Sequence, residues 1–116
     1  MYQMKFKNEQ HQNLFNKLLS KIGTWATKDK EYCSACFALA ATEKQNVFKY
    51  VDHEGIDFDQ LLKDSKLWSS GERALVKLAA TLFNSQGFPL TVQEVFYSLD
   101  HENTQAALKA IGIRYN

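Results

Sequence analysis

Residues 68–84 read WSSGERALVKLAATLFN, and this stretch predicts an α-helix at the centre of a small helical core. Ser69 and Glu72 have the spacing of a capping box, in which each side chain accepts a hydrogen bond from the other residue's backbone N–H. Apolar residues recur at helical spacing, so that one face of the helix is suited to burial. The residues of that face are Leu75, Leu78, Ala79, Leu82 and Phe83. Asn84 begins a polar turn, and Pro89 prevents the helix from resuming.

The composition is that of an ordinary globular domain. The chain has 116 residues, of which 45% are hydrophobic and 23% charged. This balance argues against disorder and predicts one domain over residues 1–116. The formal net charge is +1, so no strong overall field attracts nucleic acid or membranes. The charge is uneven, because residues 1–50 carry eight Lys and four acids, whereas residues 51–116 carry six Lys or Arg and nine acids.

The N-terminal residues predict no secretory signal, because residues 1–5 lead directly into a polar segment. No apolar run approaches the roughly 18 residues that a membrane-spanning helix needs. The two cysteines lie three positions apart, which is not a disulfide framework. We therefore expect a cytoplasmic protein.

The hydrophobic periodicity predicts an all-α fold of about six short amphipathic helices around one core. The expected helical segments are residues 9–22, 28–41, 47–51, 57–67, 69–84, 91–98 and 100–111. The segments within 69–111 form a C-terminal three-helix unit, and Gly112 is the residue expected to end the last helix. Residues 2–6 alternate between apolar and polar side chains, which is typical of a strand. We expect them to pair with residues 113–115.

The two cysteines form a Cys33-x-x-Cys36 pattern inside an alanine-rich amphipathic segment. A redox site places the first Cys at a helix N-terminus, and no strand precedes this segment to present it there. We interpret both residues as part of the core, because free Cys behaves as a small buried apolar residue. A structural zinc site needs two further ligands, and the three His residues are scattered, so we predict no metal and no cofactor.

An acidic loop contains Asp52, Glu54, Asp57 and Asp59. A calcium-binding EF-hand loop that began at Asp52 would need Gly at its sixth position and Glu at its twelfth. Those positions hold Asp57 and Lys63, which excludes the motif. Two interpretations remain: a solvated loop with a helix cap, or a negative patch that docks onto a basic partner.

Residues 91–111 resemble a helix-turn-helix, in which the second helix enters the major groove of DNA. Its outward residues Asn103, Gln105 and Lys109 have side chains suited to bases and phosphates. Residues 91–116 carry a net charge of −1, however, whereas DNA affinity depends largely on phosphate neutralisation. A packing unit or a protein-binding surface is therefore the favoured interpretation. No catalytic motif of a known class occurs in the chain.

Several motifs resemble a family of small proteins of Gram-positive bacteria, their phages and integrative elements. The motifs are FKNEQH at residues 6–11, IDF at 56–58, SSGERALVKLAATLFN at 69–84, and LDHENTQAALKAIGIR at 99–114. The resemblance spans nearly the full chain. It implies a mobile-element setting and no particular activity, so no functional residues follow from it.

We therefore expect a non-enzymatic interaction protein of a phage or mobile element that inhibits or modulates a host protein. The concrete form of this hypothesis is an anti-CRISPR-type inhibitor, whose partner would be a nucleic-acid-binding effector. The alternative is a nucleic-acid-binding regulator that uses the helix-turn-helix. The third hypothesis is an enzyme that assembles its site from distant residues.

Overall fold

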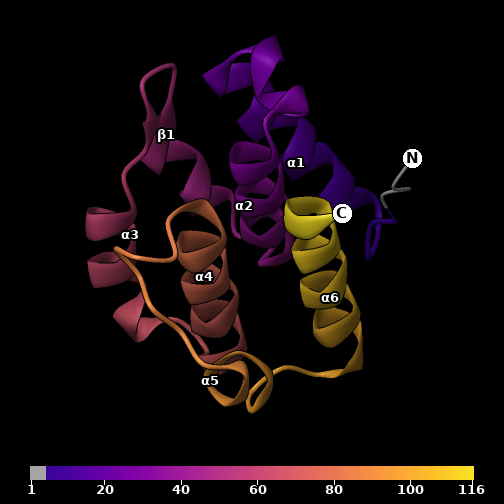
Figure 1. The fold of residues 1–116 in the computed structure, drawn as a ribbon, viewed down its shortest axis with the longest axis vertical. Coiled ribbons are helices and arrows are strands. Elements are labelled where there is room, and N and C mark those ends of the chain that lie inside the picture. The colour runs from indigo at the N-terminus through magenta and orange to yellow at the C-terminus, as the bar shows by residue number, and fades with distance from the viewer. Residues whose placement is uncertain (1–4) are drawn as a thin grey trace.

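Figure 1 shows the computed structural model, which describes residues 5–116, as a layered bundle of helices. The expected all-α fold is confirmed. The elements in chain order are α1 (Glu9–Ile22), η1 (Thr24–Lys28), α2 (Lys30–Ala41), η2 (Gln45–Tyr50), β1 (Val51–Asp52), β2 (Gly55–Ile56), α3 (Phe58–Asp64), η3 (Ser65–Leu67), α4 (Ser70–Phe83), α5 (Val92–Phe96) and α6 (His101–Tyr115). The η elements are short 3₁₀ helices, and the two strands form one small antiparallel pair in which Val51 faces Ile56.

The central helix is α2, and the prediction that residues 68–84 occupy the centre is wrong. Every residue from Cys33 to Ala41 is buried. Helices α1, α4 and α6 all pack against α2, which lies between them (Figure 1). Helix α4 is one of these three neighbours and has an exposed polar side, at Arg73 and Lys77.

Residue size explains the position of α2. A helix that is apolar on all sides belongs inside a core, whereas a helix with one apolar stripe lies at its surface. The short side chains of Ala35, Ala38 and Ala40 project little from α2, which lets the neighbouring helices approach it closely. The polar Ser34 is tolerated in this setting because its hydroxyl donates to the Glu31 carbonyl at 3.2 Å.

The cap predicted for α4 is confirmed. The Ser69 hydroxyl accepts a hydrogen bond from the Glu72 N–H at 3.2 Å, and the Glu72 carboxylate accepts one from the Ser69 N–H at 3.1 Å. A cap of this kind stabilises a helix by about 1 kcal/mol. Leu75, Leu78 and Leu82 are buried, as their spacing predicts.

The C-terminal segment differs from its prediction. Helix α6 continues through Gly112 to Tyr115, so residues 113–115 form no strand and Gly112 does not end the helix. Continuation buries Ile113 and lets Arg114 Nε donate to the Leu82 carbonyl of α4 at 3.0 Å. The other half of the predicted strand pair was residues 2–6: residues 2–4 lie outside the described residues, and residues 5 and 6 are in no strand.

Candidate partner-binding groove

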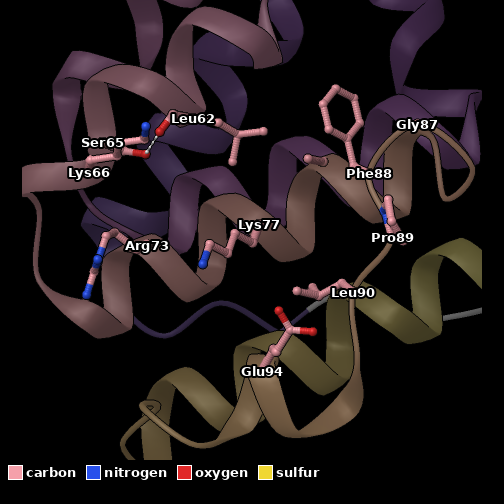
Figure 2. A pocket seen from close by; sticks show the side chains of 11 residues that line it. Leu62, Ser65, Lys66, Arg73, Lys77, Gly87, Phe88, Pro89, Leu90 and Glu94 are labelled. Atoms are coloured by element: carbon pink, nitrogen blue, oxygen red, sulfur yellow. Dashed lines mark hydrogen bonds between the residues drawn. The ribbon is translucent and has the colours of Figure 1, made fainter.

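A groove of about 660 Å³ lies between α3, η3, α4, α5 and the loop of residues 84–91. Five apolar side chains line it: Leu62, Ala80, Phe88, Pro89 and Leu90. Figure 2 shows Leu62 of α3 and Phe88 of the loop on one side of the groove, with Leu90 and Glu94 on the other. The groove therefore draws its lining from elements that are far apart along the chain.

The loop holds Phe88 in place through a tight turn. Asn84 accepts hydrogen bonds from the Gly87 N–H at its side chain (3.1 Å) and from the Phe88 N–H at its carbonyl (3.0 Å). A β-carbon at position 87 would come within 2.6 Å of the Asn84 side-chain nitrogen, so the turn favours glycine there. The Phe88 ring packs against Phe58, with ring centroids 5.9 Å apart. The apolar part of the groove is thus anchored to the core.

Three cations line the same groove: Lys66 of η3 and Arg73 and Lys77 of α4. All three are exposed, and none of their side chains makes a hydrogen bond or salt bridge with another residue among residues 5–116. The lining includes a single acid, Glu94, which gives a net charge of +2. The groove therefore combines an apolar surface with a net positive charge.

Glu94 is already committed to the N-terminal cap of α5. Its Oε1 accepts from the Thr91 N–H at 3.1 Å and from the Thr91 hydroxyl at 2.9 Å. These hydrogen bonds hold the pKa of Glu94 below its usual range. The carboxylate faces α4 from across the groove (Figure 2), but no ion pair joins it to a cation among the described residues.

Large apolar side chains are exposed on two elements that border the groove. Leu67 of η3 is 96% exposed, Val92 of α5 is 75% exposed, and Tyr97 at the end of α5 is 81% exposed. Folding gains little from side chains that remain in water. Because η3 and α5 both contribute to the groove lining, these exposed side chains make the region around the groove a candidate interface.

The predicted acidic patch is partly assembled in the structure. Asp52, Glu54 and Asp57 line a shallow hollow of about 230 Å³ at the β1–β2 hairpin. Asp59 is exposed in the first turn of α3 and is not part of that lining. Asp52 accepts from the Glu54 N–H at 2.7 Å, and Asp57 caps α3 by accepting from the Gln60 N–H at 3.1 Å. The helix cap expected in this loop is therefore confirmed, and Asp57 provides it.

The residues predicted to contact DNA lie along α6. Gln105 and Lys109 line a small hollow of about 210 Å³ together with residues 5–7. Asn103 has a structural role instead, because its side-chain oxygen accepts a hydrogen bond from Lys7 Nζ at 2.7 Å. It therefore fastens the N-terminal segment to α6.

Lys7 joins three parts of the fold. Besides its bond to Asn103, its Nζ donates to the Ala41 carbonyl at the end of α2 (2.7 Å) and pairs with the Glu43 carboxylate (2.9 Å). Burial opposes the ionisation of Glu43, but the hydrogen bonds from Lys7 and Asn8 outweigh it and lower the pKa of that carboxyl. Glu43 has a φ of +56°, a left-handed conformation that is unfavourable outside glycine, and these bonds help to hold it there.

His11 is fully buried beside this cluster. Its Nδ1 accepts from the Lys7 N–H at 3.0 Å, and its Nε2 lies 2.9 Å from the Phe37 carbonyl. Since a carbonyl can only accept, both contacts require a neutral ring with its hydrogen on Nε2. Burial lowers the pKa of His11 to about 4. The segment of residues 6–11, one of the motifs of the family resemblance, is therefore a structural clasp.

Cys33 and Cys36 are core residues, as predicted. Both thiols are buried in α2, and burial raises the pKa of Cys33 and, more strongly, that of Cys36. A thiol held in this way is a poor nucleophile, because the thiolate is the reactive form. Within residues 5–116, no three His, Cys, Asp or Glu side chains come together as a metal site, and no helix has the length and apolar character to cross a membrane.

Comparison with known proteins assigns the chain to a family but gives no activity. No curated protein and no solved structure matches the chain. A family model described as a family of unknown function (DUF6075) matches residues 1–116. Because this match covers the whole sequence, the chain belongs to that family of unknown function.

Proposed function

We propose that this protein is a non-enzymatic interaction protein of a phage or mobile element, which works in the cytoplasm by binding and inhibiting or modulating a host protein. An anti-CRISPR-type inhibitor is the concrete form of the proposal. One observation carries it: the groove between α3, α4 and α5 pairs an apolar surface with a net positive charge, and Leu67, Val92 and Tyr97 are exposed on the elements beside it. The mobile-element setting rests on the sequence resemblance.

The exposed side chains support a protein partner. Aromatic and large apolar residues that desolvate together supply most of the binding energy at protein interfaces. Tyr97 provides a rigid ring with a hydroxyl that can bond at the rim of such an interface. Leu67, which is 96% exposed, contributes little to the fold in the free protein. An interface in this region would bury these exposed apolar side chains and so explains their presence at the surface.

Catalysis is less well supported by the same structure. The neutral His11 ring and the protonated thiols of Cys33 and Cys36 are enclosed in the core, where a substrate cannot reach them. A general acid or base must lie within hydrogen-bonding reach of its substrate. The groove offers one carboxylate, Glu94, and that group caps α5.

Nucleic-acid binding through α6 is the alternative proposal. Asn103 is engaged by Lys7, which leaves Gln105 and Lys109 as the predicted contacts. This alternative requires salt-dependent DNA binding that weakens in a Lys109→Ala variant. Absence of DNA binding at low salt would eliminate it.

The test is affinity capture with matched surface variants. The tagged protein is expressed in a Gram-positive host, and captured proteins are quantified by mass spectrometry for the wild type and for a Leu67→Ser/Val92→Ser/Tyr97→Ser variant. The control is Leu108→Ser/Tyr115→Ser, which removes exposed apolar side chains from α6 instead.

We expect one host protein to be enriched by the wild type and the control, and to be lost with the triple variant. Direct binding of the purified pair then has to be shown by calorimetry, with the activity of the host protein measured in the same mixture. Failure to enrich any host protein above a tag-only control would overturn the proposal.

A further inference from the structure

We propose that the groove between α3, α4 and α5 binds an acidic amphipathic segment of a partner protein. Its apolar side chains would lie on Leu62, Phe88 and Leu90, and its carboxylates would face the cations of η3 and α4. This inference deepens the proposed function and rests on it, because it names the chemistry of the partner surface.

The cations define one wall of the groove. Arg73 and Lys77 are four residues apart on α4, so they are neighbours one helical turn apart on the same face. Lys66 extends the positive wall onto η3. The planar guanidinium of Arg73 can bind a carboxylate through two parallel hydrogen bonds. Glu94 interacts electrostatically with Lys77 across the groove, but no salt bridge joins the two residues. Within the described residues no acid pairs with Lys66 or Arg73, so these two cations are available to a carboxylate from a partner.

The rest of the groove calls for apolar groups. Its volume of about 660 Å³ falls within the roughly 300–1,000 Å³ range of ligand-binding clefts. Leu62 and Phe88 on one side and Leu90 on the other leave an apolar channel (Figure 2). An amphipathic helix presents apolar side chains every three to four residues along one face. A segment of this kind can fill the channel while its acids reach the basic wall.

Nucleic acid fits the same surface poorly. Stable binding of a polynucleotide commonly neutralises about six to ten phosphates, whereas this groove has three cations. Phosphodiester groups would leave the apolar side chains of the channel without an apolar contact. These features favour a peptide that carries both carboxylates and apolar side chains.

The probe is a fluorescein-labelled synthetic peptide of about 16 residues, a length near the minimum for a helix in water. It carries Leu and Phe at helical spacing on one face and Asp and Glu on the other, and its binding is measured by fluorescence anisotropy at low salt. We expect saturable binding that weakens as salt rises, because the contacts include exposed charges.

The decisive variant is Arg73→Glu/Lys77→Glu. Affinity should fall by about ten-fold or more, since each reversal converts attraction into repulsion. The control is Lys17→Glu/Lys28→Glu, which makes the same change in net charge on α1 and η1. It should bind as the wild type does. Helix content by circular dichroism confirms that each variant is folded.

Two further peptides test each half of the chemistry. One replaces Asp and Glu by Lys, the other replaces Leu and Phe by Ser, and both should bind at least ten-fold more weakly. Equal affinity of the first double variant and the wild type, or tighter binding of a labelled single-stranded oligonucleotide than of the acidic peptide, would overturn the inference. Concentration-dependent self-association that Arg73→Glu/Lys77→Glu abolishes would also overturn it, because the occupant would then be a second copy's acidic hairpin.

The same variants separate this inference from the proposed function. If a host protein is captured equally well by the wild type and by Arg73→Glu/Lys77→Glu, the groove is not its docking site, and the interaction proposal still stands. If the peptide binds as expected but no host protein is ever captured, the groove chemistry stands and the proposed function fails.

Discussion

Acidification should destabilise this protein through His11. The pKa of the buried ring is about 4 in the folded chain, against 6.5 for an exposed histidine. Between these two values the unfolded chain binds a proton that the folded chain excludes, so the free energy of unfolding falls as pH falls. Between about pH 7 and pH 5, linkage predicts a loss of about 2 kcal/mol from His11. The full loss, reached near pH 4, is about 3 kcal/mol.

Urea denaturation followed by tryptophan fluorescence measures this loss at each pH. The window above about pH 5 isolates His11, because the lowered pKa values of Glu43 and Glu94 affect stability mainly below the usual range of carboxyl groups. A His11→Gln variant should be less stable at pH 7, yet lose much less stability on acidification. A His53→Gln/His101→Gln variant should keep the full slope, because both rings are exposed. An unchanged slope in His11→Gln would refute the reasoning.

Three further results follow from the core and the clasp. Lys7→Met should lower the free energy of unfolding by about 1–3 kcal/mol, because it removes hydrogen bonds to Ala41 and Asn103 and the ion pair to Glu43; Lys5→Met, at an exposed position, should change it little in the same urea titration. Ala38→Leu, at a fully buried position of α2, should cost about 1–3 kcal/mol by overpacking, visible as a lower thermal midpoint. A thiol reagent such as Ellman's reagent should fail to label the two cysteines in the native protein and label both in urea, since both thiols are buried; rapid native labelling would contradict their placement.

The bounds of a helix can be predicted from this sequence where one face of the helix is apolar and the other is polar. Helix α1 was predicted over residues 9–22 and has those bounds, and α4 begins at the predicted capping box. In both, the periodic stripe and the cap residues lie within a few positions of one another. Caps and apolar stripes are local sequence features, so the bounds of a helix can be predicted from them without knowledge of the tertiary structure.

The position of α2 was harder to predict, because a helix buried on all sides has no polar stripe to orient it. The sequence of α2 shows little difference between an apolar and a polar face, whereas residues 68–84 show a clear one. The sequence therefore favours α4 as the central helix. The predicted end of α6 is wrong for a related reason. Gly112 is a common helix terminator, but burial of Ile113 and the bond from Arg114 to Leu82 favour continuation.

The clasp and the groove depend on contacts between distant residues. Lys7 bonds to residues 34 and 96 positions away along the chain, and no spacing rule links them. In the groove, the pair Arg73 and Lys77 is visible in the sequence as a polar face of α4, a pattern that usually indicates only exposure to solvent. Its proximity to Lys66 and Phe88 becomes apparent only in the folded chain.

The most direct test of the groove is a map of chemical-shift changes in ¹⁵N-labelled protein titrated with the acidic amphipathic peptide. We expect the largest changes at the backbone amides of residues 62–66, 73–80 and 87–94, with the α1 and η2 amides around residues 16–21 and 45–48 serving as the internal reference. Changes confined to these α1 and η2 amides, or to α6, would show that the peptide binds elsewhere and would contradict the assignment of the groove as the partner-binding site.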